Sequence, residues 1–241
     1  MLKKLVKFPI LKRLIPSILK ALKIRDKKFK SDGINYLLDL RYLVDRRFYL
    51  FGWDDDIIDY LDKFIKDNKC KFFLDIGSCW GIYSLRIAKK NSNVNIISFD
   101  VFHKNIERLN AMKKDNNLEN IKTFNVAIGA EKKVETFAVD EEFSPNYAKD
   151  NMGKYSISVI QDLIDNLVKL RNEKIAIKMD LERVELEALQ GANQLLKNNR
   201  CFIIIETNKN KESVFKYLKS LNFRQIKHNF DSEDYFFTNF L

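Results

Sequence analysis

From Lys71 onward, short apolar runs typical of buried strands alternate with stretches of helical periodicity, and this alternation constrains the fold more than any other feature. We expect strands at 72–76, 94–99, 121–127, 132–139, 174–179, 202–205, 224–227 and 235–238, and helices at 82–88, 103–114, 160–170, 185–196 and 213–221. Residues 140–158 have the pattern of a loop. Strands that alternate with helices form parallel βαβ units. The sequence therefore predicts an α/β protein with a Rossmann-like, doubly wound sheet, which binds ligands at the carboxyl ends of its strands.

The turn after the first of these strands, from Asp75 to Gly81, is the first candidate ligand site. Gly77 and Gly81 allow a sharp turn and a close approach of the backbone to a ligand. The two glycines are four residues apart, so the turn lacks the GxGxxG spacing of dinucleotide-binding sites, and Asp75 would oppose phosphates. An acidic side chain suits a ligand that carries a sulfonium and an amine. The alternative interpretation is a plain strand-to-helix turn.

Acidic residues also end two other strands. Asp100, 25 residues after Asp75, can accept hydrogen bonds from both hydroxyls of a ribose, or it can cap the following helix. After the strand at 174–179, the residues Asp180, Glu182 and Glu185 place several carboxylates together. Crowded carboxylates raise one another's pKa, which suits a general base, although acidic helix caps give the same pattern.

The positive charge of the chain is confined to its N-terminal arm. Residues 1–30 hold eleven Lys or Arg and one acidic residue, whereas the rest of the chain holds 32 basic and 32 acidic side chains. A nucleic-acid enzyme usually has a basic groove around its active site, so the neutral body argues against RNA as a substrate.

The arm has the apolar spacing of an amphipathic helix. The apolar positions are Leu11, Leu14, Ile15, Ile18, Leu19 and Leu22. Pro9 and Pro16 are expected to break or bend this helix. A basic amphipathic helix can lie on an anionic membrane surface, or it can pack its apolar face on its own domain, and the periodicity fits both.

The remaining sequence features concern residues 31–69, membrane spans, cysteines and metals. Residues 31–69 have mostly helical periodicity, with three acidic residues, 54–56, at the start of a helix at 57–65. No apolar run reaches the length of about 20 residues that a membrane span needs, and no cleavable signal pattern is present. Three cysteines without a CxxC pair argue against disulfides and zinc, and no spacing requires another metal. We expect a cytoplasmic protein, in peripheral contact with the inner face of a membrane if the arm binds lipid.

Four segments together resemble the FkbM-type methyltransferases. They are FLDIGSCWGIYS (73–84), SFD (98–100), NVAIG (125–129) and IKMDLERVELEALQGA (177–192), whose order and spacing match that family over roughly residues 70–206. The last segment is the most specific of the four. The resemblance implies a seven-stranded methyltransferase domain at 70–241, after the basic arm (1–30) and a helical segment (31–69), with an antiparallel C-terminal strand. It also implies S-adenosylmethionine as cofactor and O-methylation of a sugar, glycolipid, polysaccharide or polyketide hydroxyl.

The resemblance assigns roles by position. Asp75, Gly77 and Gly81 would hold the amino-acid part of the cofactor, and Asp100 its ribose. Ser78, Asn125 and Ala127 would complete the cofactor site. Asp180 and Glu182 would lie at the reacting end, where one of them acts as the base for the acceptor hydroxyl. His103 is a weaker candidate, because it is expected to start a helix.

Three positions depart from the family pattern. Cys79 replaces Asn, Asp100-Val101 replaces Glu-Pro, and Arg183 replaces Gly. If the family glycine takes a positive φ, Arg183 carries backbone strain. Cys79 and Arg183 therefore keep open a catalytically inactive donor-binding or scaffold protein, beside the alternative of an RNA methyltransferase. A nicotinamide oxidoreductase is the weakest alternative, for want of the three-glycine motif.

Overall fold

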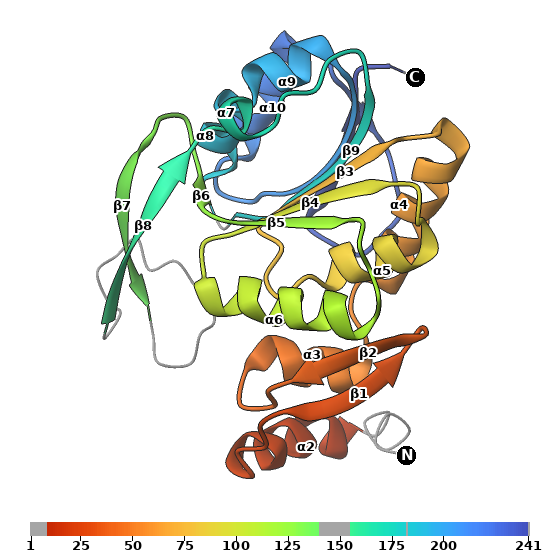
Figure 1. The fold of residues 1–241 in the computed structure, drawn as a ribbon, viewed down its shortest axis with the longest axis vertical. Coiled ribbons are helices and arrows are strands. Elements are labelled where there is room, and N and C mark those ends of the chain that lie inside the picture. Colours follow the sequence, from red (N-terminus) through yellow and green to blue (C-terminus); the bar gives the residue numbers. More distant parts are fainter. Residues whose placement is uncertain (1–8, 140–154, 182, 241) are drawn as a thin grey trace. The chain divides into compact units, whose positions relative to one another are not determined.

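The computed structural model describes residues 9–139, 155–181 and 183–240. The chain divides into two compact units, one of residues 1–55 with 138–157 and the other of residues 56–137 with 158–241. Figure 1 shows the elements of both units along the chain. None of the helices in these described ranges is long and apolar enough to cross a membrane.

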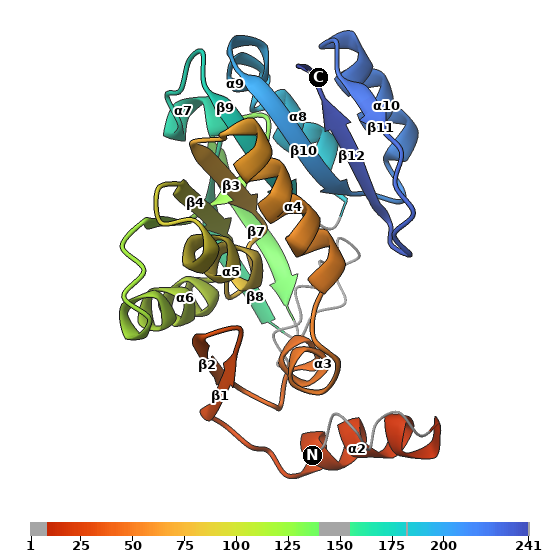
Figure 2. The same cartoon turned by 90° about the vertical axis from the view of Figure 1, so that its right-hand side faces the viewer.

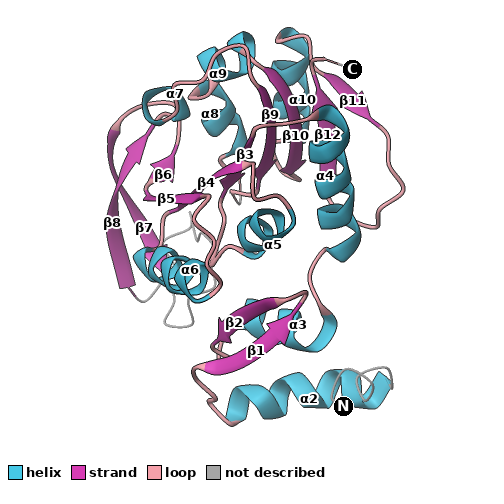
Figure 3. Ribbon diagram, turned by 45° about the vertical axis from the view of Figure 1, so that its right-hand side comes forward, coloured by secondary structure: helices cyan, strands magenta, loops and turns pink. Residues whose placement is uncertain are grey.

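The smaller unit contains helix α2 (Pro9–Ala21), strands β1 (Lys27–Ser31) and β2 (Ile34–Leu38), and helix α3 (Leu43–Phe51) (Figure 3). The strands form an antiparallel hairpin around Asp32 and Gly33, whose φ angles are 51° and 72°. Positive φ at both central residues is the geometry of a type I′ turn, for which Asp-Gly is a favoured pair. The predicted helical character of residues 31–69 is therefore wrong for 34–38, because the turn chemistry outweighs weak periodicity.

Aromatic packing holds this unit together. Tyr36 and Phe48 are buried, with ring centroids 4.8 Å apart in an edge-to-face arrangement, and Phe29 lies 5.7 Å from Phe48. Helix α2 continues through Pro16, so this proline does not break the helix, which was one of the two outcomes expected of it. A proline removes one backbone hydrogen bond, and the burial of Ile15 and Leu19 on either side of it offsets that loss.

The larger unit is built on one seven-stranded sheet. Its strands are β3 (Phe72–Ile76), β4 (Asn95–Asp100), β5 (Ile121–Asn125), β9 (Lys174–Met179), β10 (Arg200–Glu206), β11 (Arg224–Ile226) and β12 (Asp234–Thr238). Their order is β11-β12-β10-β9-β3-β4-β5. The strands from β5 to β10 pair in parallel, and β12 is antiparallel to both of its neighbours. The predicted Rossmann-like, mostly parallel sheet with an antiparallel C-terminal strand is confirmed.

Helices cover both faces of this sheet (Figures 1 and 2). Helices α4 (Asp55–Asn68), α5 (Ile82–Lys90) and α6 (His103–Asp115) lie on one face, and α7 (Ile164–Leu167), α8 (Glu185–Gln190), α9 (Asn193–Asn198) and α10 (Lys211–Ser220) lie on the other. On the first face, Phe64 of α4 stacks on Phe202 of β10 at 3.9 Å between centroids. On the second, Ile177 and Ile203 of the sheet join the same buried cluster as Leu189 and Leu218 of the helices. These layers leave the carboxyl ends of β3, β4, β9 and β10 along one edge.

Strands β6 (Ala127–Ile128), β7 (Lys133–Val139) and β8 (Tyr155–Asp162) form a second sheet in the order β6-β8-β7. The predicted loop is therefore wrong for 155–158, and the predicted helix at 160–170 shrinks to α7. Exposure alternates from Ser156 to Ile160, and Ile157, Val159 and Ile160 are β-branched. Alternation of period two with β-branched residues favours a strand over a helix.

The predicted single helix at 185–196 is also wrong, because it breaks at Gly191 into α8 and α9. A Cβ at Gly191 would lie 2.0 Å from the carbonyl oxygen of Gly129, so the chain passes too close for a side chain there. Asp165 then starts α9 by accepting hydrogen bonds from the amides of Gln194 and Leu195, each at 2.8 Å. A capping side chain from a distant part of the chain cannot be read from local periodicity.

Candidate functional site

Polar residues gather on one face of the sheet, near the carboxyl ends of its central strands. Asp75 of β3 is the register partner of Ser98 on β4 and of Lys178 on β9. Since side chains of a strand alternate between faces, Asp100 points to the same face as Ser98. Asp180 follows the end of β9, and its Oδ2 lies 4.0 Å from Lys178 Nζ. The sheet order thus brings together three segments that the sequence predicted as candidate sites.

The turn from Gly77 to Gly81 is tied down by its own backbone. The amides of Gly77 and Ser78 donate to the carbonyl of Phe99 at 3.0 and 2.9 Å, and the amide of Gly81 donates to Ser78 at 2.8 Å. The amide of Cys79 donates to Asp100 Oδ2 at 2.9 Å. These four amides all have protein acceptors, so they form no anion-binding nest of the kind that holds a pyrophosphate.

The glycines of this turn are required by close packing. Gly77 has a φ of 84°, and a Cβ there would lie 1.8 Å from the backbone oxygen of Asp180. Gly81 has a φ of 90°, and its Cβ would lie 2.4 Å from Leu109 Cδ1. The structure therefore supplies an internal reason for both glycines, and a role for them in holding a ligand stays a prediction.

Asp75 lies beneath the turn, with 2% of its surface exposed. Its Oδ2 accepts hydrogen bonds from the amide and the hydroxyl of Ser84, at 3.1 and 2.5 Å, and the same hydroxyl lies 2.7 Å from Ser98 Oγ. Burial raises the pKa of Asp75 to about 6, and the bonds from Ser84 oppose that rise. In this arrangement the carboxylate braces the start of α5, and its predicted contact with a cofactor stays a prediction.

Asp100 is held at the end of β4 by both of its carboxylate oxygens. Oδ1 accepts from the amide of Phe102 at 2.8 Å and from Asn105 Nδ2 at 3.0 Å, while Oδ2 faces the Cys79 amide. Burial raises the pKa of Asp100 to about 7, against these hydrogen bonds. Asp100 thus stabilises the start of α6, as one interpretation predicted, and its Oδ2 lies at the turn that was predicted to bind the cofactor.

The remaining predicted cofactor residues lie around these elements. Ser78 is buried, with its amide committed to Phe99. Asn125 donates through Nδ2 to the carbonyls of Asp100 and Val101, at 3.0 and 2.9 Å, and so closes the end of β4. Ala127 is buried in β6.

A buried lysine, which the sequence analysis did not single out as a site residue, lies at the centre of an acidic cluster. Lys178 Nζ is 3.0 Å from Asp234 Oδ1 and 4.0 Å from both Asp180 Oδ2 and Glu206 Oε2. It also lies 5.6 Å from the ring centroid of Tyr83 on α5. Burial alone would lower the pKa of Lys178, but the three carboxylates outweigh burial and raise it. Lys178 is therefore a permanent cation that neutralises part of this cluster.

Asp180 and Glu206 form the open side of the cluster. Their side chains are 38% and 43% exposed, whereas those of Lys178 and Asp234 are 4% and 5% exposed. Burial, together with the charge of Asp180, raises the pKa of Glu206 to about 8. The raised pKa favours the protonated form of Glu206, and Asp180 is the other carboxylate of the cluster that is open to an acceptor.

Other candidates from the sequence have different surroundings. Glu182 lies outside the described residues. Glu185 is 2% exposed and its Oε1 accepts from the amide of Arg183 at 2.8 Å, so it caps the start of α8 and is not solvated. Burial raises the pKa of Glu185, against the hydrogen bond from Arg183. His103 begins α6 and lies 3.3 Å from Glu107, as expected of a helix-start residue.

Arg183 has a φ of 94°, the conformation that was predicted to strain it. We expect Arg183→Gly to raise the free energy of unfolding by about 1 kcal/mol, because only glycine adopts this φ without a steric cost. The measurement is urea unfolding of both proteins. Arg183→Ala is the matched control: it removes the side chain and keeps the strain, so equal stabilisation by both variants would exclude a backbone origin.

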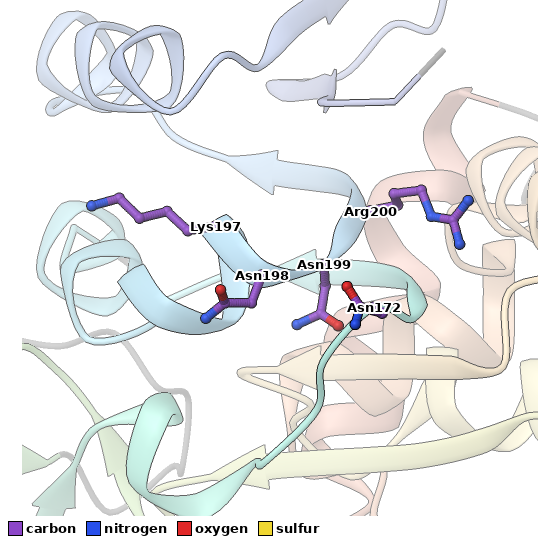
Figure 4. Close-up of a pocket in the computed structure, with 5 residues that line it drawn as sticks. All are labelled: Asn172, Lys197, Asn198, Asn199 and Arg200. Atoms are coloured by element: carbon purple, nitrogen blue, oxygen red, sulfur yellow. The ribbon is translucent and has the colours of Figure 1, made fainter.

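A surface pocket lies at the opposite edge of the sheet, before β9 and at the start of β10. Figure 4 shows its lining residues, with Lys197 and Arg200 pointing away from the asparagines between them. Asn199 Oδ1 accepts from the amide of Glu173 at 2.9 Å, and its Nδ2 donates to Leu170 and Leu195. These bonds give Asn199 a structural role, and ligands of such sheets bind at the other edge.

Within the described ranges, no group of three or more His, Cys, Asp or Glu side chains is arranged to hold a metal ion. No family model matches the sequence, and no curated relative matches it.

Solved structures of methyltransferases share this fold. An FkbM methyltransferase from Methylobacillus flagellatus matches with a TM-score of 0.51 and 14% identity, over 95% of this chain and 59% of that chain. An rRNA methylase from Streptococcus thermophilus matches with a TM-score of 0.44 and 14% identity, over 76% of this chain and 92% of that chain. The tRNA (uracil-54, C5)-methyltransferase of Pyrococcus abyssi, solved with S-adenosyl-L-homocysteine, matches with a TM-score of 0.49 and 12% identity, over 88% of this chain and 43% of that chain. The first of these three matches agrees with the Rossmann-like fold of the sheet. The FkbM protein is one of the structures that have it, and this chain spans about three-fifths of its length.

Proposed function

We propose that this protein is an S-adenosylmethionine-dependent methyltransferase that methylates a hydroxyl of a sugar, glycolipid or polysaccharide precursor. The observation that carries the proposal is the contact between Asp100 Oδ2 and the Cys79 amide, which joins a buried carboxylate at the end of β4 to the glycine turn after β3. Further support comes from the fold and from the resemblance of four segments to the FkbM-type family.

The residues present fit this cofactor. A carboxylate accepts hydrogen bonds from ribose hydroxyls, and acidic surroundings favour a sulfonium and an amine over phosphates. The turn from Gly77 to Gly81, with Ser78, would hold the amino-acid part, Asp100 the ribose, and Asn125 and Ala127 the neighbouring part of the cofactor. The bound cofactor supplies an activated methyl group on a sulfonium.

The protein would contribute alignment and proton removal. Holding an acceptor hydroxyl in line with the methyl group lowers the entropic cost of the reaction. Asp180 would accept the hydroxyl proton, with Glu182 as the alternative base. Lys178 would help to position Asp180, because its Nζ attracts the carboxylate from 4.0 Å away.

The cofactor is tested by calorimetric titration with S-adenosylmethionine and, separately, with NAD. We expect micromolar binding of the first alone, and at least about tenfold weaker binding by Asp100→Asn, because charge-assisted hydrogen bonds to the ribose are lost. Since the pKa of Asp100 is about 7, the affinity should rise between pH 6 and 8 in the wild type as the carboxylate ionises, and this contribution should be absent in Asp100→Asn.

Asp115→Asn, at the exposed end of α6, is the matched control and should bind the cofactor as the wild type does. Binding of NAD in place of S-adenosylmethionine would refute the proposal. Binding of S-adenosylmethionine without methyl transfer to any acceptor would instead favour a catalytically inactive scaffold protein. The positive φ of Arg183 is the observation that makes such a protein the second candidate.

The base is tested by transfer of labelled methyl groups to a panel of glycolipid and oligosaccharide acceptors. Asp180→Asn should abolish turnover and leave cofactor affinity within a few-fold, because an amide keeps the shape of the side chain and accepts no proton at neutral pH. Asp231→Asn, an exposed substitution, should leave both unchanged. Full activity of Asp180→Asn would remove this residue from the mechanism, and transfer to RNA alone would replace the proposed acceptor class.

A further inference from the structure

Exposed apolar side chains concentrate in the smaller unit. Seven large apolar residues of the described chain are exposed, and five of them belong to this unit: Leu14, Ile18, Leu22, Leu43 and Phe51. The other two, Val134 and Ile160, belong to the larger unit. Contiguous apolar surface on a soluble protein commonly marks an interaction site.

Helix α2 carries two apolar stripes with different surroundings. Ile15 and Leu19 are 8% and 7% exposed, and the helix contacts α3 of the same unit. The second stripe consists of Leu14, Ile18 and Leu22, which are 51%, 55% and 60% exposed. Residues four apart in a helix share one face, so Leu14 and Ile18 form a line about 100° around the helix from the buried pair. Leu22, one residue past the end of α2, continues this line, because its amide donates to the carbonyl of Ile18 at 2.9 Å. Packing on its own unit therefore accounts for one stripe and leaves the other exposed.

Positive charge follows the C-terminal end of the exposed stripe. Lys23 and Arg25 are both exposed and come directly after Leu22, just past the end of the helix. They belong to residues 1–30, which hold eleven basic residues and one acidic residue, while the rest of the chain is neutral. An apolar stripe flanked by cations is the pattern of helices that lie in the interface of an anionic membrane.

We propose that the smaller unit docks on an anionic lipid bilayer, with Leu14, Ile18 and Leu22 entering the interface and Lys23 and Arg25 contacting the headgroups. Lipid fits this surface better than RNA, because aliphatic side chains offer no ring on which a base can stack. The proposal goes beyond the methyltransferase function and does not depend on it.

The test is sedimentation of the full chain with vesicles of phosphatidylcholine, alone or mixed with phosphatidylserine. We expect binding to the mixed vesicles that weakens as salt is raised. Leu14→Ser with Ile18→Ser should lower the partition coefficient at least about tenfold, because two apolar side chains no longer leave water. Lys23→Gln with Arg25→Gln should lower it by about fivefold for each charge removed.

Val134→Ser with Ile160→Ser is the matched control, since it removes two exposed apolar side chains from the larger unit and should leave vesicle binding unchanged. Unchanged binding of Leu14→Ser with Ile18→Ser would overturn the proposal. The proposal would also be overturned if the wild type did not bind vesicles but self-associated, and the variant abolished this self-association. Binding of polyuridylate in place of vesicles would overturn it as well. Titration with S-adenosylmethionine should be the same for all variants, which separates this proposal from the enzymatic one.

Discussion

Gly77→Ala should destabilise the protein by about 3 kcal/mol or more and should also abolish cofactor binding. The added Cβ would lie 1.8 Å from the oxygen and 2.9 Å from the carbon of the Asp180 backbone carbonyl, so the end of β9 must move. The φ of 84° adds about 1–2 kcal/mol for any residue with a Cβ, and forced shifts in a packed core add about 1–3 kcal/mol. For a chain of this size, such a loss lowers the melting temperature by roughly 6–12 °C.

The matched control is Gly81→Ala, in the same turn with a similar φ of 90°. Its Cβ would meet the side chain of Leu109, which can move to another rotamer, whereas the Asp180 carbonyl cannot. We therefore expect a clearly smaller loss of stability for Gly81→Ala, measured by thermal unfolding and by titration with S-adenosylmethionine. If Gly77→Ala melts at the wild-type temperature or binds the cofactor normally, the close approach of β3 and β9 at this turn is not part of the folded protein.

Sequence patterns predict the centre of the fold well, because its strands are buried on both sides. The apolar runs at 72–76 and 174–179 match β3 and β9 without a shift of either boundary. The positive φ of Arg183 also follows from the resemblance, since a family glycine marks a conformation that few other residues adopt. These features depend on a few consecutive residues, so local sequence is sufficient to predict them.

Two features missed by the sequence analysis had local signals. Asp32-Gly33 between alternating apolar residues indicates the β1–β2 hairpin, and β-branched alternation at 156–160 indicates β8. At the hairpin, a loose helical periodicity hides the more specific signal of the turn. At β8, the pattern predicts a loop up to residue 158 and a helix from residue 160, and both predictions miss the alternation of period two. Turn chemistry and period-two alternation therefore carry more information than apolar spacing over short segments.

The acidic cluster around Lys178 had no local signal. Its members come from three strands, and Asp234 is 56 residues from Lys178 in the sequence. They meet because β12 turns back antiparallel to β10, which makes Asp234 the register partner of Glu206. In the sequence, Asp180 follows β9, Glu206 ends β10 and Asp234 begins β12. Only the sheet order shows that one lysine contacts all three carboxylates.

Lys178→Met should destabilise the protein by about 3–5 kcal/mol, because it leaves the buried carboxylate of Asp234 without its cation. The same change should raise the pKa of Glu206 above its value of about 8, because Lys178 opposes that rise in the wild type. Urea unfolding measures the first effect, and carboxyl NMR titration of Glu206 the second.

Asp234→Asn in the Lys178→Met background is the deciding control. It replaces both members of the 3.0 Å pair by neutral groups of similar size, so it should recover most of the lost stability. Asp180 and Glu206 are nearly half exposed and can be solvated without the lysine, which is why rescue should follow from Asp234 and not from Asp180→Asn in the same background. Equal rescue by either substitution would mean that Lys178 balances the whole cluster, and no rescue by either would mean that its alkyl chain, not its charge, supports the sheet.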